Sequence, residues 1–234
     1  MIVLFYRVKM ISDNLKSVTQ RITRCCEKMG KGPGCVTLIC VAKEVGPREI
    51  KEAVGLGVKD IGENRVQDAL SKYKVLGDIV RWHMIGHLQT NKVKDALKIF
   101  SLIHSVDSMR LAEEIDKEAG RAKKVQDILI QVNVSGEDTK FGIRPDEAGS
   151  FIKAVSLCAN INIRGLMTIA PEVKDPETVR PYFRKLRALM DEINSLKLTA
   201  YSLQLLSMGM TNDFEVAIEE GSNMVRIGRA IFKC

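Results

Sequence analysis

The feature that most constrains this fold is a regular alternation of short apolar runs with helical patterns. Eight β-type runs occur along the chain, at residues 36–42, 58–62, 80–86, 101–106, 128–134, 161–168, 202–207 and 224–232. Several are apolar at nearly every position, which indicates strands covered on both faces. Helical patterns lie between them, at residues 47–55, 64–76, 91–100, 108–122, 144–159, 175–196 and 213–220.

Strict strand–helix alternation predicts a parallel sheet with right-handed crossovers. Eight repeats fit a closed (β/α)₈ TIM barrel better than an open sheet, although an open doubly wound sheet stays possible because periodicity does not report closure. A further amphipathic helix is expected over residues 12–29, before the first strand. No linker interrupts the pattern, so we expect one domain over residues 1–234, with residues 1–9 as an extension that adds little.

Charge and cysteine content limit the partners. Lys and Arg number 36 against 29 Asp and Glu, a modest excess that favours acidic ligands without establishing nucleic-acid binding. The densest basic stretch, residues 180–187, is better explained as a solvated helix face than as a phosphate-backbone patch. No apolar run approaches the roughly 20 residues of a membrane helix. Six cysteines without a Cys-x-x-Cys pair argue against zinc, and we expect reduced thiols in a cytosolic protein, with Cys40 in the core.

Working residues of a barrel lie where its strands end. Lys43 directly follows the first apolar run, where partial desolvation would lower its pKa and free an amine for a Schiff base. The alternative is a lysine that simply reaches solvent. Asn64, after the second run, either faces the mouth or caps the next helix.

Histidines at positions 83 and 87 share a strand face in this interpretation but lie roughly 13 Å apart. With no acidic partner in the motif we expect no metal site, and a hydrogen-bonded or ring-packing His83. The glycine-bracketed segment 135–143 either closes over a site or is a surface loop. Met167 fits the core better than a ligand contact.

The last two strand exits could cradle a phosphate. Small residues at Ser207 and Gly209 precede a helix, and Gly228 lets backbone approach an anion closely. Plain turns are the competing explanation for each exit.

Several motifs occur together in one order. They are Val41-Ala42-Lys43, Ile61-Gly62-Glu63-Asn64, the stretch from Trp82 to Lys92, Ser105-Val106-Asp107-Ser108, Gly165-Leu166-Met167-Thr168-Ile169, Leu206-Ser207-Met208-Gly209-Met210 and Val225-Arg226-Ile227-Gly228. Across nearly the whole chain, from about Ser12 to Phe232, the sequence resembles the pyridoxal phosphate homeostasis protein family, the alanine-racemase-like single barrels of the YggS type.

The resemblance implies an alanine racemase N-terminal-like barrel in which Lys43 carries pyridoxal 5′-phosphate (PLP) as an internal aldimine. It implies that phosphate is held by Ser207 and the backbone around Gly228 and Arg229, that Arg226 faces the pyridine nitrogen, and that Asn64, His83 and Met167 line the cofactor. The family is regarded as a carrier or regulator of the PLP pool without established turnover. Apo PLP-dependent enzymes as acceptors, a cytoplasmic location and a monomer or weak dimer are therefore expected.

Some positions depart from the family pattern. Ala42 replaces the usual serine before the lysine, Asn223 stands where threonine is common, and the chain stops at Lys233-Cys234 instead of continuing through glycine. These departures put in doubt a hydrogen bond near the aldimine and the exit of the final strand.

Arginine can only donate hydrogen bonds, so a ring nitrogen facing Arg226 should stay unprotonated and be a poorer electron sink. No tyrosine stands at a strand end to act as the second base of a racemase. These points favour a carrier over a PLP-dependent amino-acid racemase. A cofactor-free Schiff-base aldolase and a basic RNA-binding domain are weaker alternatives.

Overall fold

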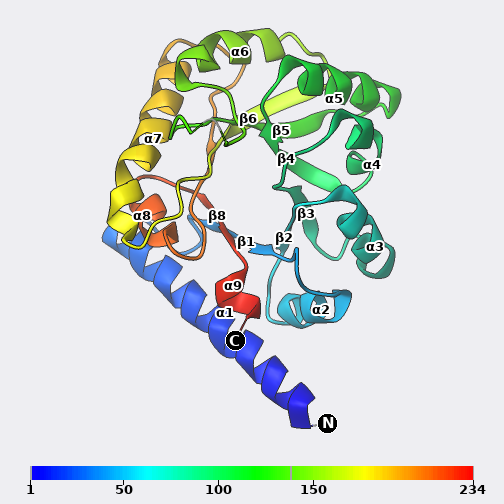
Figure 1. Ribbon diagram of the computed structural model, residues 1–234, viewed down its shortest axis with the longest axis vertical. Helices are drawn as coiled ribbons and strands as arrows, with labels where there is room; N and C mark the ends of the chain where they lie inside the picture. The colour runs from blue at the N-terminus through cyan, green and yellow to red at the C-terminus, as the bar shows by residue number, and fades with distance from the viewer. Residues whose placement is uncertain (1, 138, 234) are drawn as a thin grey trace.

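The expected closed (β/α)₈ barrel is confirmed. The computed structural model describes residues 2–137 and 139–233, with side chains from residue 10 onward. Within these residues, eight parallel strands pair in chain order and β8 pairs with β1, which excludes the open sheet (Figure 1). The strands are β1 (Thr37–Val41), β2 (Asp60–Glu63), β3 (Arg81–Met84), β4 (Phe100–Val106), β5 (Gln126–Gln131), β6 (Ile161–Met167), β7 (Leu205–Ser207) and β8 (Met224–Ile227).

Helices follow the strands and cover the outside of the barrel (Figure 1). They are α2 (Pro47–Gly55), α3 (Val66–Leu76), α4 (Val93–Ala96), α5 (Met109–Arg121), α6 (Ala148–Val155), α7 (Arg180–Ser195) and α8 (Phe214–Glu219), with 3₁₀ turns at Thr90–Lys92, Pro145–Glu147 and Pro176–Val179. Local sequence explains several starts. Pro47 occupies the first turn of α2, and the Ser108 hydroxyl accepts the Leu111 N–H at the start of α5.

The N-terminal helix α1 (Ile2–Lys28) packs along the barrel beside α8 and the C-terminal helix α9 (Arg229–Phe232) (Figure 1). Its buried stripe includes Ile11, Leu15 and Val18. The helix begins ten residues earlier than the expected Ser12, so the proposed extension 1–9 is helical from Ile2 onward. That this extension adds little stays a prediction.

Two expected elements were wrong in extent. The run 224–232 is not one strand, because β8 ends at Ile227 and α9 follows after Gly228. The apolar residues of α9 resemble a strand in sequence. In the structure, the N–H groups of Ile231 and Phe232 donate hydrogen bonds to the Gly228 carbonyl and close a helical turn. The expected helix 91–100 shrinks to one 3₁₀ turn and α4, and Phe100 already belongs to β4.

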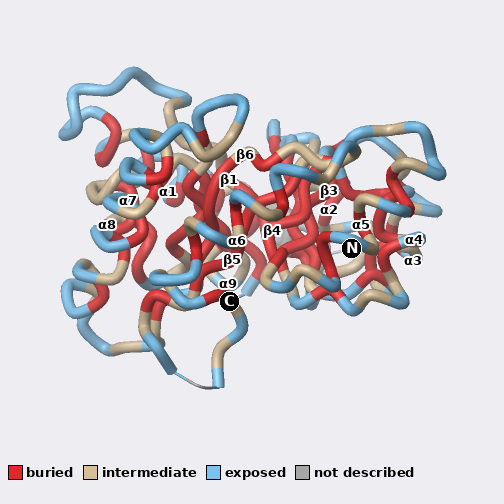
Figure 2. Tube along the Cα trace, turned by 90° about the horizontal axis from the view of Figure 1, so that it is seen from above, coloured by how far each residue is buried: buried red, intermediate tan, exposed pale blue. Residues whose placement is uncertain are grey.

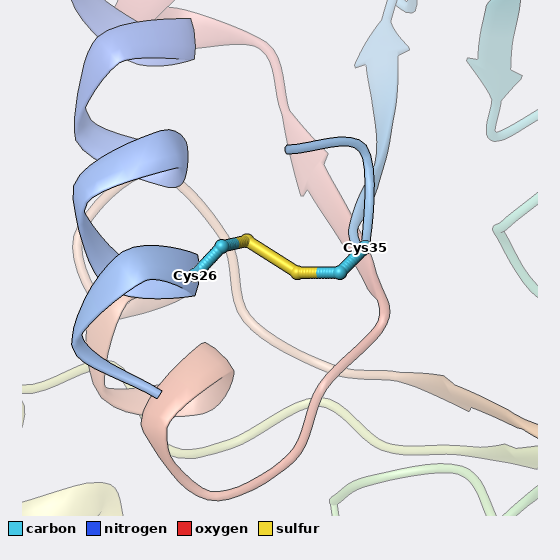
Figure 3. Close-up of a disulfide and its surroundings, with 2 residues drawn as sticks. All are labelled: Cys26 and Cys35. Carbon is cyan, nitrogen blue, oxygen red and sulfur yellow. A yellow bond between two sulfur atoms is a disulfide. The ribbon is translucent and has the colours of Figure 1, made fainter. Parts of the chain in front are cut away.

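The expectation of reduced thiols was wrong for two cysteines, while Cys25, Cys40 and Cys158 are free thiols as expected. Cys26, at the end of α1, forms a disulfide with Cys35, which lies just before β1 (Figure 3). Their separation of nine residues gives no recognisable motif, and only the return of the chain from α1 to the barrel brings them together. Cys40 lies in the core as expected, and burial raises the pKa of its thiol to about 12.

The buried residues form stretches in the interior of the molecule (Figure 2), and their hydrophobic side chains make a core of two parts. The larger part lies between strands and helices. The smaller is drawn from strands alone and fills the barrel interior with Ile39, Leu102, Leu129, Met167 and Met224. Inward side chains of a TIM barrel form such a packed plug, which forces ligands to the strand ends.

The basic stretch 180–187 is neutralised by neighbouring acids. Arg180 pairs with Glu177, Glu219 and Glu220, and Arg184 shares Glu220. Arg187 pairs with Asp191. These carboxylates occupy the guanidinium groups that a phosphate backbone would need, which supports the solvated helix face.

Candidate cofactor site at the barrel mouth

A cavity of about 550 Å³ opens at the carboxyl ends of the strands. We call it the mouth cavity. Of the sequence-predicted residues it brings together Lys43, Arg226, Gly228 and Arg229; it is also lined by Lys140, Thr211 and Lys233, which had not been predicted. The lining also holds the carboxylates of Glu44, Glu172 and Asp213, and Glu44 and Glu172 pair with Lys233 and Arg229. The five cations outnumber these three acids, so the balance of charge favours an anionic ligand.

Lys43 lies at the rim of this cavity, directly after β1. Its side chain is 49% exposed, and its Nζ lies 3.9 Å from Glu44 Oε1. The lysine therefore reaches solvent and also lines the cavity, and its role as a Schiff-base amine stays a prediction.

A buried ion pair fixes the backbone that carries Lys43. Lys72, from α3, donates from Nζ to the Ala42 carbonyl at 2.6 Å and to Glu63 Oε1 at 2.5 Å. Glu63 ends β2 and is fully buried, and burial raises the pKa of its carboxyl although Lys72 acts in the opposite direction. Helix α3 thus ties together the ends of β1 and β2.

Arg226 forms the floor of the mouth cavity. Its guanidinium is buried and donates to Ser207 Oγ at 2.6 Å and to the Thr168 carbonyl at 2.8 Å. Burial lowers its pKa to about 10, and Asp213 opposes this effect. At neutral pH the group is still a cation, held by two neutral acceptors.

Ser207, His83 and Met167 are buried and are not part of the mouth-cavity lining. The Ser207 hydroxyl is bonded beneath Arg226 and also lies 2.9 Å from His104 Nδ1. His83 contacts Asp60 and His104, and its ring meets the His104 ring edge-on, which confirms the hydrogen-bonded, ring-packing interpretation. Met167 belongs to the interior plug.

Asn64 lies apart from these residues, in a smaller cavity of about 260 Å³ that it shares with His87. Helix α3 begins after Arg65 and has no side-chain cap, so the capping alternative for Asn64 is not what the structure contains. The Asn64 backbone packs tightly against Gly86, where a side chain would collide with it.

The segment 135–143 reaches over the mouth, although its residue 138 lies outside the described residues. Lys140 lines the mouth cavity, and the Phe141 ring stacks on His87 with centroids 4.0 Å apart. His87 Nδ1 in turn lies 3.8 Å from Asp107 Oδ2. These contacts favour closure over the site rather than a free surface loop.

The residues present fit PLP. An aldehyde needs an amine, which Lys43 offers; a phosphate needs cations and close backbone, which Arg229, Lys233 and the glycine turns offer. At Gly228 a Cβ would lie 3.0 Å from the Val41 carbonyl oxygen, a tight contact that the glycine avoids.

Other ligand classes find less support. Among the described residues, no group of three or more His, Cys, Asp or Glu side chains could hold a metal. Across the same residues, no helix combines the length and apolar character that a membrane crossing requires.

Sequence reasoning missed the polar residues beneath the mouth. Lys72, His104 and Thr168 all act on site residues, yet none was singled out. One signal was available for His104, because it is a polar residue within the otherwise mostly apolar run of β4. Its partner was not readable, since Ser207 lies 103 residues away.

Comparison with known proteins agrees with this geometry. The family model for the N-terminal domain of alanine racemase matches residues 13–234. An alanine racemase from Clostridium difficile has the same fold, with a TM-score of 0.72 at 16% identity, and the match covers 94% of this chain and 56% of that one.

Nearer relatives match along their full length. PipY of Synechococcus elongatus, solved with PLP bound, aligns with a TM-score of 0.82 and 32% identity over 95% of this chain and 99% of that one. The pyridoxal phosphate homeostasis protein of Aquifex aeolicus is 48% identical over 223 residues, 94% of this chain and 96% of the relative. With this identity over nearly the whole of both chains, and with the family model matched over residues 13–234, this chain belongs to the pyridoxal phosphate homeostasis protein family.

Proposed function

We propose that this chain binds PLP at the mouth cavity, through a reversible covalent bond to Lys43, and acts in PLP homeostasis as a carrier of the cofactor. One observation carries the proposal: the Lys43 amine and the buried Arg226 guanidinium line the same cavity of about 550 Å³ at the ends of β1 and β8. The amine and the cation stand on neighbouring strands, as a ligand with an aldehyde and a basic ring nitrogen requires.

PLP supplies an aldehyde that a lysine amine bonds reversibly. Within the proposal, Arg226 donates to the ring nitrogen and keeps it unprotonated, because a guanidinium has no acceptor. The Thr168 carbonyl and Ser207 hold the guanidinium in place.

The phosphate is assigned to the backbone around Gly228 and Arg229. The resemblance also gave Ser207 this role, but its hydroxyl would first have to leave His104 and Arg226. Thr211 lines the cavity and is therefore our candidate for the phosphate hydroxyl contact. Asn64, His83 and Met167 stay predicted as residues around the ligand, with His83 and Met167 beneath it.

The proposed setting follows from the site. Apo PLP-dependent enzymes would receive the cofactor in the cytoplasm, and the whole chain, 1–234, would act as one PLP-binding unit, as a monomer or weak dimer. The half-exposed Lys43 supports release, since an acceptor can reach it. A cytoplasmic location requires that the Cys26–Cys35 disulfide persists there, although most cytosols keep thiols reduced.

The test is a visible absorption spectrum of protein mixed with PLP, before and after borohydride, followed by peptide mapping. We expect the label on Lys43, and its loss in Lys43→Arg. Lys140→Arg and Lys233→Arg are matched controls, because both lysines line the same cavity and should leave the label in place. A label on either control lysine in the wild-type protein would refute the site.

Carrier and racemase are separated by a second measurement. Exchange of the α-proton of amino acids in deuterated water reports catalysis directly. We expect little exchange in the wild-type protein. Rapid exchange that disappears in Lys43→Arg would show that the protein is an enzyme and would refute the carrier proposal.

A further inference from the structure

A continuous chain of hydrogen bonds crosses the barrel interior from β2 to β8. His83 Nε2 lies 2.9 Å from Asp60 Oδ1, and His83 Nδ1 lies 3.0 Å from His104 Nε2. His104 Nδ1 lies 2.9 Å from Ser207 Oγ, which accepts from Arg226 at 2.6 Å. From sequence, only His83 was expected to be hydrogen-bonded or ring-packing, and no prediction joined these residues. Together they form one unit, which we call the Asp60–Arg226 chain.

The two ends fix the direction of every hydrogen in this chain. Hydrogen bonds from His83 and Arg81 outweigh burial and lower the pKa of Asp60 to about 2, so its carboxylate only accepts. Arg226 at the other end only donates. His83 must therefore carry its hydrogen on Nε2, His104 must also carry it on Nε2, and the Ser207 hydroxyl must donate to His104 Nδ1.

A different placement of the hydrogens leaves a buried group unsatisfied. A second hydrogen on the His83 ring would face His104 Nε2 and move the His104 hydrogen to Nδ1. The Ser207 hydroxyl would then have no acceptor, and a buried donor without an acceptor is rare in folded proteins because it costs folding free energy. The neutral arrangement is thus the one in which all four contacts are made.

The alignment also explains how a cation is tolerated at this depth. His83, His104 and Ser207 each point a hydrogen toward Asp60 and a lone pair toward Arg226. Their dipoles are therefore aligned with the field between the carboxylate and the guanidinium. Bonds aligned head to tail polarise one another and gain strength at low dielectric. The nearby Asp213 carboxylate opposes the effect of burial on Arg226 directly, and the aligned chain adds acceptor polarity at Ser207.

We propose that Asp60, His83, His104 and Ser207 are positioning residues that hold Arg226 in one orientation toward the mouth cavity. The effect of this positioning on PLP binding rests on the proposed function, whereas the arrangement of hydrogens in the ligand-free protein does not. Asp60 is remote from the mouth: it opens β2 and lines, with Arg81, a separate groove of about 960 Å³ beside α1. By strand rise it lies roughly 10 Å below the end of β2.

The first test needs no variant and no cofactor. Two-bond ¹⁵N–¹H NMR of the histidine rings in the ligand-free protein reports which nitrogen is protonated. Both His83 and His104 should be Nε2–H tautomers at neutral pH. A hydrogen on His104 Nδ1 would overturn the proposal, whatever the protein does with PLP.

Asp60→Asn tests the coupling along the chain. An amide can accept through its oxygen or donate through its nitrogen, so the Asp60 end no longer fixes the direction. Arg226 still fixes it through the Ser207 hydroxyl, so both histidines should keep their Nε2–H tautomers. Arg81→Gln is the matched control, because it removes the other partner of Asp60 and leaves the carboxylate in place. A hydrogen that moves to Nδ1 in either histidine of Asp60→Asn would show that the Arg226 end does not set the direction, and a change in one ring alone would show that the two rings are not coupled.

PLP affinity tests the consequence. Ser207→Ala should weaken binding roughly tenfold, because one hydrogen bond to a charged group is lost. Ser105→Ala is the control, since the Ser105 hydroxyl is buried on the same barrel without a hydrogen-bond partner. Equal affinities of the two variants would refute the positioning role. If wild type binds no PLP, the proposed function fails while the NMR result still decides the chain.

Discussion

At the scale of single residues, the site depends on groups whose charge state is fixed by burial. His104 is fully buried, and burial, followed by His83 and Arg226, lowers its pKa well below 6.5. The folded protein therefore keeps this ring neutral under conditions in which an unfolded chain would protonate it.

That difference makes a prediction about acid. Below pH 6.5 the unfolded state binds a proton that the folded state refuses, so this contribution to stability is lost as the pH falls. Between pH 7.5 and 5.5, His104 should lower the free energy of unfolding by about 1 kcal/mol. Urea unfolding at the two pH values measures it. A slope that persists undiminished in His104→Phe would assign the effect elsewhere.

Gly209 offers a second prediction at this scale. It has a φ of +93°, and a Cβ there would lie 2.6 Å from Ala217 Cβ. Gly209→Ala should cost about 2 kcal/mol or more, from backbone strain and a clash together. Gly57→Ala is the control, because its φ of +96° is similar but nothing lies within 4 Å. Thermal unfolding of both variants isolates the clash, and equal losses would contradict it.

At the scale of elements, helix α3 positions the lysine strand through Lys72. Lys72→Met should cost roughly 3–5 kcal/mol, because it leaves the Glu63 carboxyl buried without its cation. The double variant Lys72→Met/Glu63→Met should recover much of this loss, since well-packed apolar residues often replace a buried pair. Denaturant unfolding of the single and double variants completes the cycle. Additive losses would show that the pair is not coupled.

The same scale shows what the sequence can and cannot reveal. Helix 47–55 was predicted to the residue, because proline, amphipathic spacing and glycine all lie within nine positions. The helical α9 was mistaken for strand, since a short apolar run carries no period. Lys43 and Arg226 follow from local position and family motifs, whereas Lys72 and His104 acquire their roles only from residues on distant elements.

At the scale of the whole molecule, α1 is a long helix lying against one side of the barrel (Figure 1). Packing against α8 and α9 holds it there, and the Cys26–Cys35 disulfide closes the link to β1. Strand β1, which ends two residues before Lys43, is thus linked near its start, through Cys35, to helix α1.

Removing this link should lower global stability. A closed loop of this length contributes about 2.5 kcal/mol in the chain-entropy model. Cys26→Ser/Cys35→Ser, or reduction of the wild type, should lower the Tm by roughly 5–10 °C. Calorimetry with and without reductant measures it. Reductant should leave the Tm of the double variant unchanged, and an equal drop there would trace the effect to another cause.

The fixed direction of the Asp60–Arg226 chain has a consequence for proton traffic. A proton that hops along such a chain exchanges the donor and the acceptor of every hydrogen bond it passes. The reversed chain would need Asp60 to donate and Arg226 to accept, which a carboxylate and a guanidinium cannot do. The Asp60–Arg226 chain therefore does not conduct protons from one end of the barrel interior to the other. Any proton exchanged with a ligand at Lys43 must come from solvent or from the groups around the rim.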